Sequence, residues 1–390
     1  MLPKLHLDPA VLARYRLDAL ASALYGVFSG IIMPFISIAA LTLGAEPWHI
    51  ALLTAAPFAG KILSLIGGAY IGQRSKRTIF ILSCIVERIC WMLTAFIVSP
   101  TYFSFLAVLL YLVEMFRVPA HISIIHAMYP TGVRGSIITR LMMVAGALGF
   151  IATLFTGYLL DSVSHRILFP IGAIFGLLSL LVFSKINIPE IDERRTPKET
   201  LRHILILCKG NKPLHKFLLF TTFIEGSQLL LAPLIPLFLV QVLTLPKKLI
   251  GVLFGIQTLA TILLSPFLGH FLDRLGPIRV LRFLGIAAML GTAFFFFGHW
   301  LILIPAFILL GCIGAGIFPS FIESQKLFVP PSRINDSSAI VATVSGIRGA
   351  TLPFLAVSMS VTLGYTVTFA IIIAIAFIGT VLYSTDAHYA

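Results

Sequence analysis

The residues best suited to do chemistry are charged side chains in the middle of long apolar stretches. A charge at the centre of a bilayer costs at least about 2.5–3.5 kcal/mol, so such residues usually face the interior of a helix bundle and lie on a solute or ion pathway. We therefore expect a polar pathway through a membrane protein, used by a solute, a proton or both. The seven mid-span charges are Lys61, Glu87, Arg88, Glu114, Arg117, Glu225 and Arg348.

The clearest polar stripe lies in residues 102–127. At helical spacings of seven, three, three and four it contains Ser104, Tyr111, Glu114, Arg117 and His121. Glu114 and Arg117 can pair along this face. The pattern has two interpretations. The stripe handles a solute or a proton, or the two residues form an internal salt bridge whose only role is to allow both charges to insert into the membrane. His121 lies on the same stripe, although a lone histidine is more often a packing residue than a ligand.

Two further stripes lie in the second half of the chain. Glu225 shares a face with Thr221 and Gln228, and an isolated mid-membrane glutamate can titrate when its surroundings become wet. Glu225 is therefore predicted to carry a proton, the alternative being a neutral, hydrogen-bonded acid. Arg348 lies on a stripe of hydroxyl residues and is predicted either to bind an anionic group or to pair with an acid on a neighbouring helix.

The remaining mid-span charges lie in residues 48–71 and 78–98. Lys61 falls on a stripe with small and polar residues, so we expect it to face the interior, either in contact with the solute or without that contact. Glu87 and Arg88 are adjacent and point about 100° apart on a helix. The family resemblance described below implies that this helix is peripheral, and hence that these two residues are structural.

The composition requires a membrane to position these groups. The chain has 390 residues, of which 58% are hydrophobic and 11% charged, whereas soluble domains are about 45–50% apolar and about 25% charged. This excludes a cytosolic enzyme, a disordered chain and a secreted disulfide scaffold. The net charge of +13 does not indicate nucleic-acid binding, because the basic residues flank apolar spans. The four cysteines have neither metal spacing nor a paired framework, so we expect free thiols, no metal and no cofactor.

Twelve apolar runs have the length of a membrane-crossing helix, about 20 residues. They predict an all-α membrane protein with 12 transmembrane helices in two pseudo-symmetric six-helix bundles. The expected organisation is a six-helix half over 1–185, a linker with a short amphipathic helix over 186–215 and a second half over 216–390. The runs are 19–43, 48–71, 78–98, 102–127, 138–160, 167–185, 216–241, 249–272, 279–298, 301–325, 337–361 and 364–384.

The loop charges predict the orientation. Loops on the side of the termini contain 21 Lys and Arg, and loops on the opposite side contain 3. Because cytoplasmic loops carry the excess of Lys and Arg, both termini are predicted to be cytoplasmic, in a multi-pass protein of the plasma (inner) membrane. We expect a monomer in the lipid bilayer.

The two halves repeat at an offset near 200. Pro119 matches Pro319, and Pro130 matches Pro330. Two six-helix halves joined by a basic loop are typical of a transporter built from repeats, with its site at their interface.

A glycine- and arginine-containing loop after the eighth run resembles the signature loop of the major facilitator superfamily, G-x-x-x-D-R-x-G-x-x-R. The copy after the second run keeps a glycine and a basic tail but has Gly72 in place of the acid. The resemblance implies alternating access around a central site. It also implies that Asp273 docks at the cytoplasmic start of helix five, here near Ser136 to Arg140. The matched residues are Gly269, Asp273, Arg274, Gly276 and Arg279, with Gly68, Arg74 and Arg77 in the first copy.

These patterns predict a secondary active transporter that moves a small solute and is coupled to protons. Coupling to sodium is the alternative. Four basic against three acidic mid-span residues favour an anionic or zwitterionic solute. An alternative is a drug or metabolite efflux antiporter, disfavoured because residues 152–157 lack the family's G-P-x-x-G-G signature. Alternatives of another class are an integral-membrane enzyme, disfavoured because no D-D-x-x-D or D-x-D cluster occurs, and a non-transporting scaffold.

Overall fold

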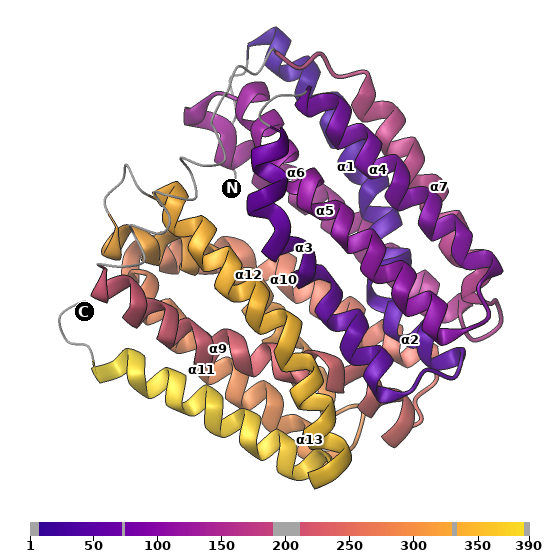
Figure 1. Ribbon diagram of the computed structural model, residues 1–390, viewed down its shortest axis with the longest axis vertical. Coiled ribbons are helices and arrows are strands. Elements are labelled where there is room, and N and C mark those ends of the chain that lie inside the picture. Colours follow the sequence, from indigo (N-terminus) through magenta and orange to yellow (C-terminus); the bar gives the residue numbers. More distant parts are fainter. Residues whose placement is uncertain (1–7, 72–74, 190–210, 330–333, 386–390) are drawn as a thin grey trace.

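Every regular element in the described part of the chain is a helix (Figure 1). The computed structural model describes residues 8–71, 75–189, 211–329 and 334–385. The first half contains α1 (Pro9–Ile32), α2 (Ile36–Thr42), α3 (Pro47–Ile71), α4 (Lys76–Leu93), α5 (Pro100–Met128), α6 (Thr131–Leu159) and α7 (His165–Ser184). The second half contains α9 (Lys212–Leu237), α10 (Lys247–Leu275), α11 (Pro277–Ala293), α12 (Leu303–Phe328) and α13 (Ile334–Thr385).

The helices account for the twelve predicted crossings. Ten helices of the described residues are long and apolar enough to cross a membrane, judged by length and composition. One of them joins α1 to α2 through a 3-10 turn at Met33–Phe35. Another, α13, changes direction at Gly364, whose φ of +80° suits glycine, and so supplies both of the last two predicted spans. The 25-residue helix α3 supplies the second span.

Several helices extend beyond the predicted apolar runs. α1 begins at Pro9, where the Asp8 carboxylate accepts a hydrogen bond from the Ala10 backbone N–H, ten residues before the predicted start. Only Tyr129 and Pro130 separate α5 from α6. The fifth transmembrane helix therefore begins at Thr131, and its predicted start near Ser136 to Arg140 was wrong. Polar end turns continue a helix even though a hydropathy window excludes them.

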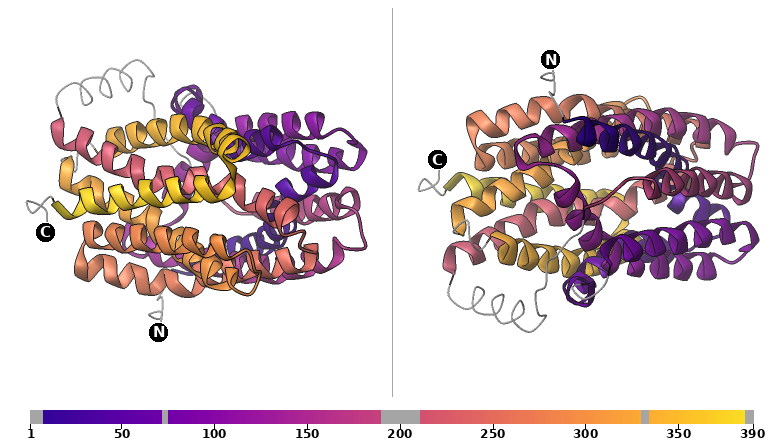
Figure 2. Two further views of the ribbon diagram at one scale, coloured as in Figure 1. Left: turned by 90° about the horizontal axis from the view of Figure 1, so that it is seen from below. Right: turned by 90° about the horizontal axis from the view of Figure 1, so that it is seen from above.

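The element bounds confirm the repeat at an offset of 200. α3 begins at residue 47 and α10 at 247, while α5 ends at 128 and α12 at 328. Short 3-10 turns follow α4 and α11, at Thr94–Phe96 and Phe294–Phe297. The two bundles lie side by side (Figure 2). The predicted amphipathic linker helix lies outside the described residues, and the exact domain limits stay a prediction.

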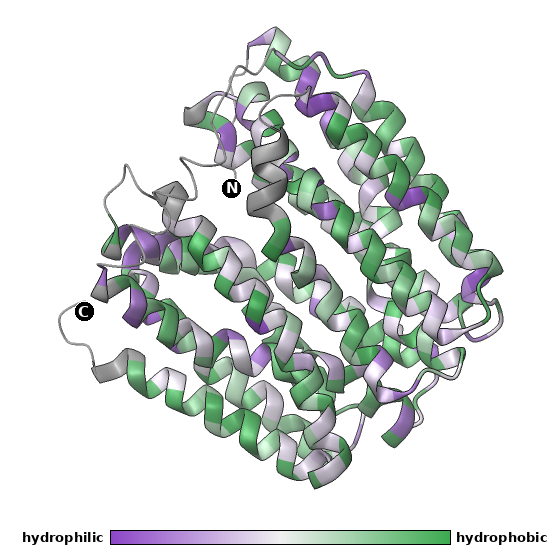
Figure 3. Cartoon of the chain, in the orientation of Figure 1, coloured by the Kyte–Doolittle hydropathy of each residue, from purple (hydrophilic) through white to green (hydrophobic). Residues whose placement is uncertain are grey.

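The surface of the bundle is suited to lipid. Hydrophobic residues predominate along the helices (Figure 3), and many large apolar side chains are exposed, for example Phe155, which is 65% exposed. Inside the first half, α1 and α6 approach closely because both present small residues. A Cβ atom on Gly26 would lie 2.1 Å from the Ala145 carbonyl oxygen, and one on Gly30 would lie 2.3 Å from that of Gly149. Such small-residue contacts allow the backbone packing that drives helix association in membranes.

Candidate functional site

The two halves are sealed together on the side of the molecule opposite the termini, here called the far side. Gly157 of α6 and Gly251 of α10 meet so closely that a Cβ atom on either would lie 2.6–2.7 Å from the Cα of the other. The Asp161 carboxylate, just beyond α6, accepts hydrogen bonds from the backbone N–H groups of Lys247 (2.9 Å) and Lys248 (3.2 Å). These N–H groups form the start of α10, where an acid is favoured by the helix dipole.

A second contact between the halves joins α3 and α13. A Cβ atom on Gly349 would lie 2.0–2.1 Å from carbon atoms of the Phe58 ring, and one on Gly346 would lie 2.7 Å from Ile62. Lys61 lies in the same part of α3, is exposed, and places its Nζ 4.5 Å from the centroid of the Phe58 ring. Side chains larger than hydrogen at these two glycines would separate α3 from α13.

On the side of the termini, called the terminal side, the same helices α6 and α10 part and line a cavity of about 890 Å³. It extends to Thr139 and Leu272, near the terminal-side ends of these helices. The structure therefore describes a state that is closed on the far side and hollow toward the terminal side. The cavity is also lined by the turn after α1 and by α12. Among its lining residues are Met33, Met142, Met143, Phe254, Gln257, Thr258, Thr261, Ser265 and Ser320.

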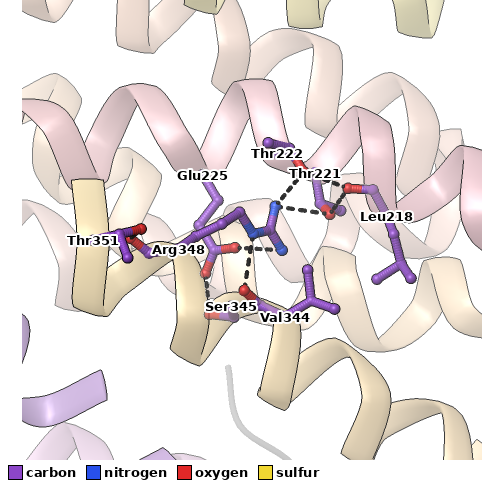
Figure 4. A network of polar contacts seen from close by, with 8 residues as sticks. All are labelled: Leu218, Thr221, Thr222, Glu225, Val344, Ser345, Arg348 and Thr351. Carbon is purple, nitrogen blue, oxygen red and sulfur yellow. Dashed lines mark hydrogen bonds and ion pairs between the residues drawn. The ribbon is translucent and has the colours of Figure 1, made fainter. Parts of the chain in front are cut away.

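In the second half, Glu225 and Arg348 form a buried ion pair between α9 and α13 (Figure 4). Arg348 Nη2 lies 3.1 Å from Glu225 Oε2, and the second carboxylate oxygen accepts a hydrogen bond from Ser345. Arg348 Nη1 also donates to the Thr221 and Thr222 hydroxyls, at 3.3 and 3.0 Å. The predicted stripes on these two helices thus meet each other.

Gln228 lies one turn beyond Glu225 on α9. Its Nε2 atom is buried and has no hydrogen-bond partner among the described residues. A buried amide donor without a partner costs about 1–3 kcal/mol, so it is usually satisfied by water or a ligand. Gln228 is therefore the member of this stripe with unused hydrogen-bonding capacity.

In the first half, the predicted pair of Glu114 and Arg117 forms along α5. Arg117 Nη1 also lies 3.8 Å from Glu87 Oε2 of α4, and Glu87 accepts a hydrogen bond from Arg88. The Arg88 guanidinium carbon lies 4.6 Å from the centroid of the Phe28 ring of α1. Glu87 therefore joins α4 to α5, a connection that its position in the sequence did not reveal.

This geometry predicts that Glu87 matters more for stability than Glu114. Glu87 faces two arginines and is 6% exposed, whereas Glu114 pairs with one arginine and its side chain is 24% exposed. Glu87→Gln should lower the melting temperature in detergent clearly more than Glu114→Gln, since breaking a buried pair costs about 3–5 kcal/mol and exposed pairs are worth about 0–1. Equal melting temperatures of the two variants would contradict a linking role for Glu87.

Two of the other three residues predicted on the α5 stripe, Tyr111 and His121, contact an apolar or aromatic side chain. His121 stacks on Phe80, with ring centroids 4.9 Å apart, and lines a separate cavity of about 210 Å³ inside the first half. Its position agrees with a packing role. The Tyr111 hydroxyl lies 3.7 Å from the sulfur of Met33, which lines the large cavity.

The predicted gating loop lies on the terminal side. Gly276, with φ of +78°, separates α10 from α11, and Asp273, Arg274 and Arg279 are exposed. No hydrogen bond or ion pair of Asp273 occurs within the described ranges, so its docking on α6 stays a prediction for the opposite state.

Four other residues were predicted to belong to the gating loops. Gly269 lines the cavity, and Arg77 donates a hydrogen bond to the Ser184 carbonyl. Gly68 lies in α3, but its surroundings are outside the described part. Arg74, like Gly72, lies outside the described residues.

Sequence reasoning missed a polar row on α10. Gln257, Thr261 and Ser265 are spaced by four residues and line the cavity. The spacing was visible in the sequence, but a search for charged residues passes over it.

Two six-helix halves around a cavity, sealed at one end only, define a membrane transporter and not an enzyme. The chain belongs to the major facilitator superfamily, whose family model matches residues 19–225 and 217–388. No curated protein matches the sequence.

The structure resembles solved structures of two transporters. A point mutant of the nucleoside transporter NupG aligns with a TM-score of 0.79 at 13% identity, covering 95% of this chain and 99% of that one. A bacterial homologue of the human lysosomal transporter Spinster, inward-facing and unoccupied, aligns with a TM-score of 0.67 at 16% identity, covering 97% of each chain. At sequence identities this low, the similarity shows a shared fold only.

Proposed function

We propose that this protein is a proton-coupled secondary transporter that carries a small solute by alternating access across the plasma (inner) membrane. The observation that carries the proposal is the asymmetry of the contacts between α6 and α10. They are in backbone contact at Gly157 and Gly251 and line a cavity near their opposite ends. The excess of Lys and Arg in the loops of the terminal side supports cytoplasmic termini, and hence a state that faces the cytoplasm.

Glu225 is the proposed proton carrier. Its charge is balanced by Arg348 and its second oxygen by Ser345, so binding a proton would remove the ionic attraction between α9 and α13. Glu114 is less suited, because its partner Arg117 lies on the same helix and also faces Glu87. Protonation of Glu114 would therefore not remove an ion pair between two helices. A two-state contact whose strength depends on one proton is the kind of element that couples a gradient to a conformational change.

The predicted anionic or zwitterionic solute rests on an excess of mid-span cations. Three of these four cations, Arg88, Arg117 and Arg348, form ion pairs with the three mid-span acids. The surplus of one positive charge is thus that of Lys61, and none of the four cations is among the described residues that line the large cavity. The charge of the solute must therefore be inferred from the cavity lining.

The coupling is tested with purified protein in liposomes, using a solute found by a thermal-shift screen. Glu225→Gln should still bind the solute with little change in affinity but should lose the acceleration of uptake by an imposed proton gradient. Glu114→Gln is the matched control and should keep that acceleration. If Glu225→Gln responds to the gradient as the wild type does, Glu225 is not the proton carrier.

A further inference from the structure

The lining of the large cavity carries no charge within the described residues. No Asp, Glu, Lys or Arg is among the side chains that line it. Three methionines and Phe254 supply apolar surface, and methionine adapts its shape to irregular ligands. A charged solute in such a site would lose hydration without gaining a counter-charge, which is strongly unfavourable.

Apart from Thr139 of α6, the polar side chains that line the cavity belong to α10 and α12. Three hydroxyl groups on α10 already donate their protons to backbone carbonyls, Thr258 to Phe254 (3.0 Å), Thr261 to Gln257 (2.9 Å) and Ser265 to Thr261 (2.6 Å). Each oxygen therefore keeps only lone pairs for a ligand. This row can accept hydrogen bonds but cannot donate them without losing its helix contacts.

Two cavity residues retain free hydrogen-bonding groups. The Ser320 side chain is fully buried and lines the cavity, and its Oγ has no hydrogen-bond partner in the part of the chain that the structure describes. Gln257 lies one turn before Thr261, and no hydrogen bond of its amide occurs in the described part of the chain. A buried hydroxyl without a partner is unfavourable unless water or a ligand satisfies it.

We propose that the cavity selects an uncharged solute with an apolar body that carries hydroxyl or amide donors, recognised by Gln257, Ser320 and the acceptor row on α10. A volume of about 890 Å³ suits a drug-sized molecule, since ligand sites occupy about 300–1,000 Å³. This inference rests on the proposed transport function, because it treats the cavity as the solute site.

The charge preference can be measured without knowing the solute. Thr258→Cys, in a protein whose four native cysteines are replaced by alanine, is labelled with three methanethiosulfonates: hydroxyethyl (neutral), sulfonatoethyl (anionic) and trimethylammonioethyl (cationic). Rates are divided by those at Gly135→Cys, an exposed position on the terminal side of α6. Apart from the adjoining backbone of its own helix, no described atom there lies within 4 Å of the added Cβ. The neutral reagent should be favoured over each charged one by about tenfold or more.

A second variant tests whether the lining itself sets this preference. Adding Gln257→Arg should raise the relative rate of the anionic reagent about tenfold, while Gln241→Arg, an exposed site at the far-side end of the α9 segment, should not. Equal relative rates for neutral and anionic reagents at position 258, or no effect of Gln257→Arg, would overturn the proposal. A neutral preference together with gradient-independent uptake would refute proton coupling and leave this inference intact.

Discussion

Gly157→Leu should open the far side and abolish most transport. A leucine side chain cannot fit where a single added carbon would lie 2.6 Å from the Gly251 Cα. Overpacking of this kind costs about 1–3 kcal/mol. It should therefore shift the ratio of far-side-closed to far-side-open molecules roughly 5- to 150-fold. The measurement is the labelling rate of Phe254→Cys in the cavity by a membrane-impermeant maleimide added from each side.

The control for this prediction is the same substitution on the same helix. Gly135 lies on the terminal side, where no described atom outside the adjoining helix backbone is within 4 Å of the added Cβ. Phe254→Cys combined with Gly135→Leu should therefore be labelled as Phe254→Cys alone is. With Gly157→Leu, Phe254→Cys should be labelled from the far side. Without it, Phe254→Cys should be labelled only from the terminal side. Labelling of Gly157→Leu from the terminal side alone would show that the glycine contact does not hold the seal.

Glu225→Leu should destabilise the protein more than Arg348→Leu. Removing one partner of a buried ion pair costs about 3–5 kcal/mol because the other charge is left uncompensated. A carboxylate left alone can bind a proton and become neutral, whereas an arginine stays charged. Arg348 is 7% exposed, so little water can compensate it. The measurement is thermal unfolding in detergent at neutral pH.

The double variant Glu225→Leu with Arg348→Leu should recover much of the loss, because neither charge then remains buried. Thr221→Ala is a milder control, since it removes one hydrogen bond of Arg348 and leaves the ion pair in place. If Arg348→Leu is the more damaging single change, the pair does not have the energetic asymmetry inferred from its burial.

The fold could be predicted from the sequence because lipid imposes a simple rule. Each crossing needs about 20 apolar residues in a helix, so the twelve crossings could be placed within a few residues at most ends. The ends were predicted less well where polar residues continue a helix, as at Pro9 and Thr131. A hydropathy pattern indicates which residues contact lipid, whereas local geometry determines where a helix begins. The Asp8 carboxylate caps α1, and the extended backbone of Pro130 precedes α6.

The site could be predicted only where its contacts are local. Glu114 and Arg117 are three residues apart on one helix, and their pairing follows from helical spacing. Glu225 and Arg348 are 123 positions apart in the sequence. Pairing of Arg348 with an acid on a neighbouring helix was therefore one of two alternatives, and the acid could not be named. The contact of Asp161 with the start of α10 depends on how the halves pack. The spacing of the α10 polar row is visible in the sequence, but the cavity that the row lines forms only when the halves pack.

Alternating access predicts that the two ends of the α6 and α10 pair move in opposite senses. Spin labels can be placed in pairs at the exposed positions Gly135 and Arg274 on the terminal side, and Ser162 and Lys248 on the far side. Pulsed dipolar spectroscopy on each pair in lipid nanodiscs then reports both distances, with and without Gly157→Leu. Lengthening of the far-side distance together with shortening of the terminal-side distance is the predicted result. Lengthening on the far side with no change on the terminal side would contradict alternating access.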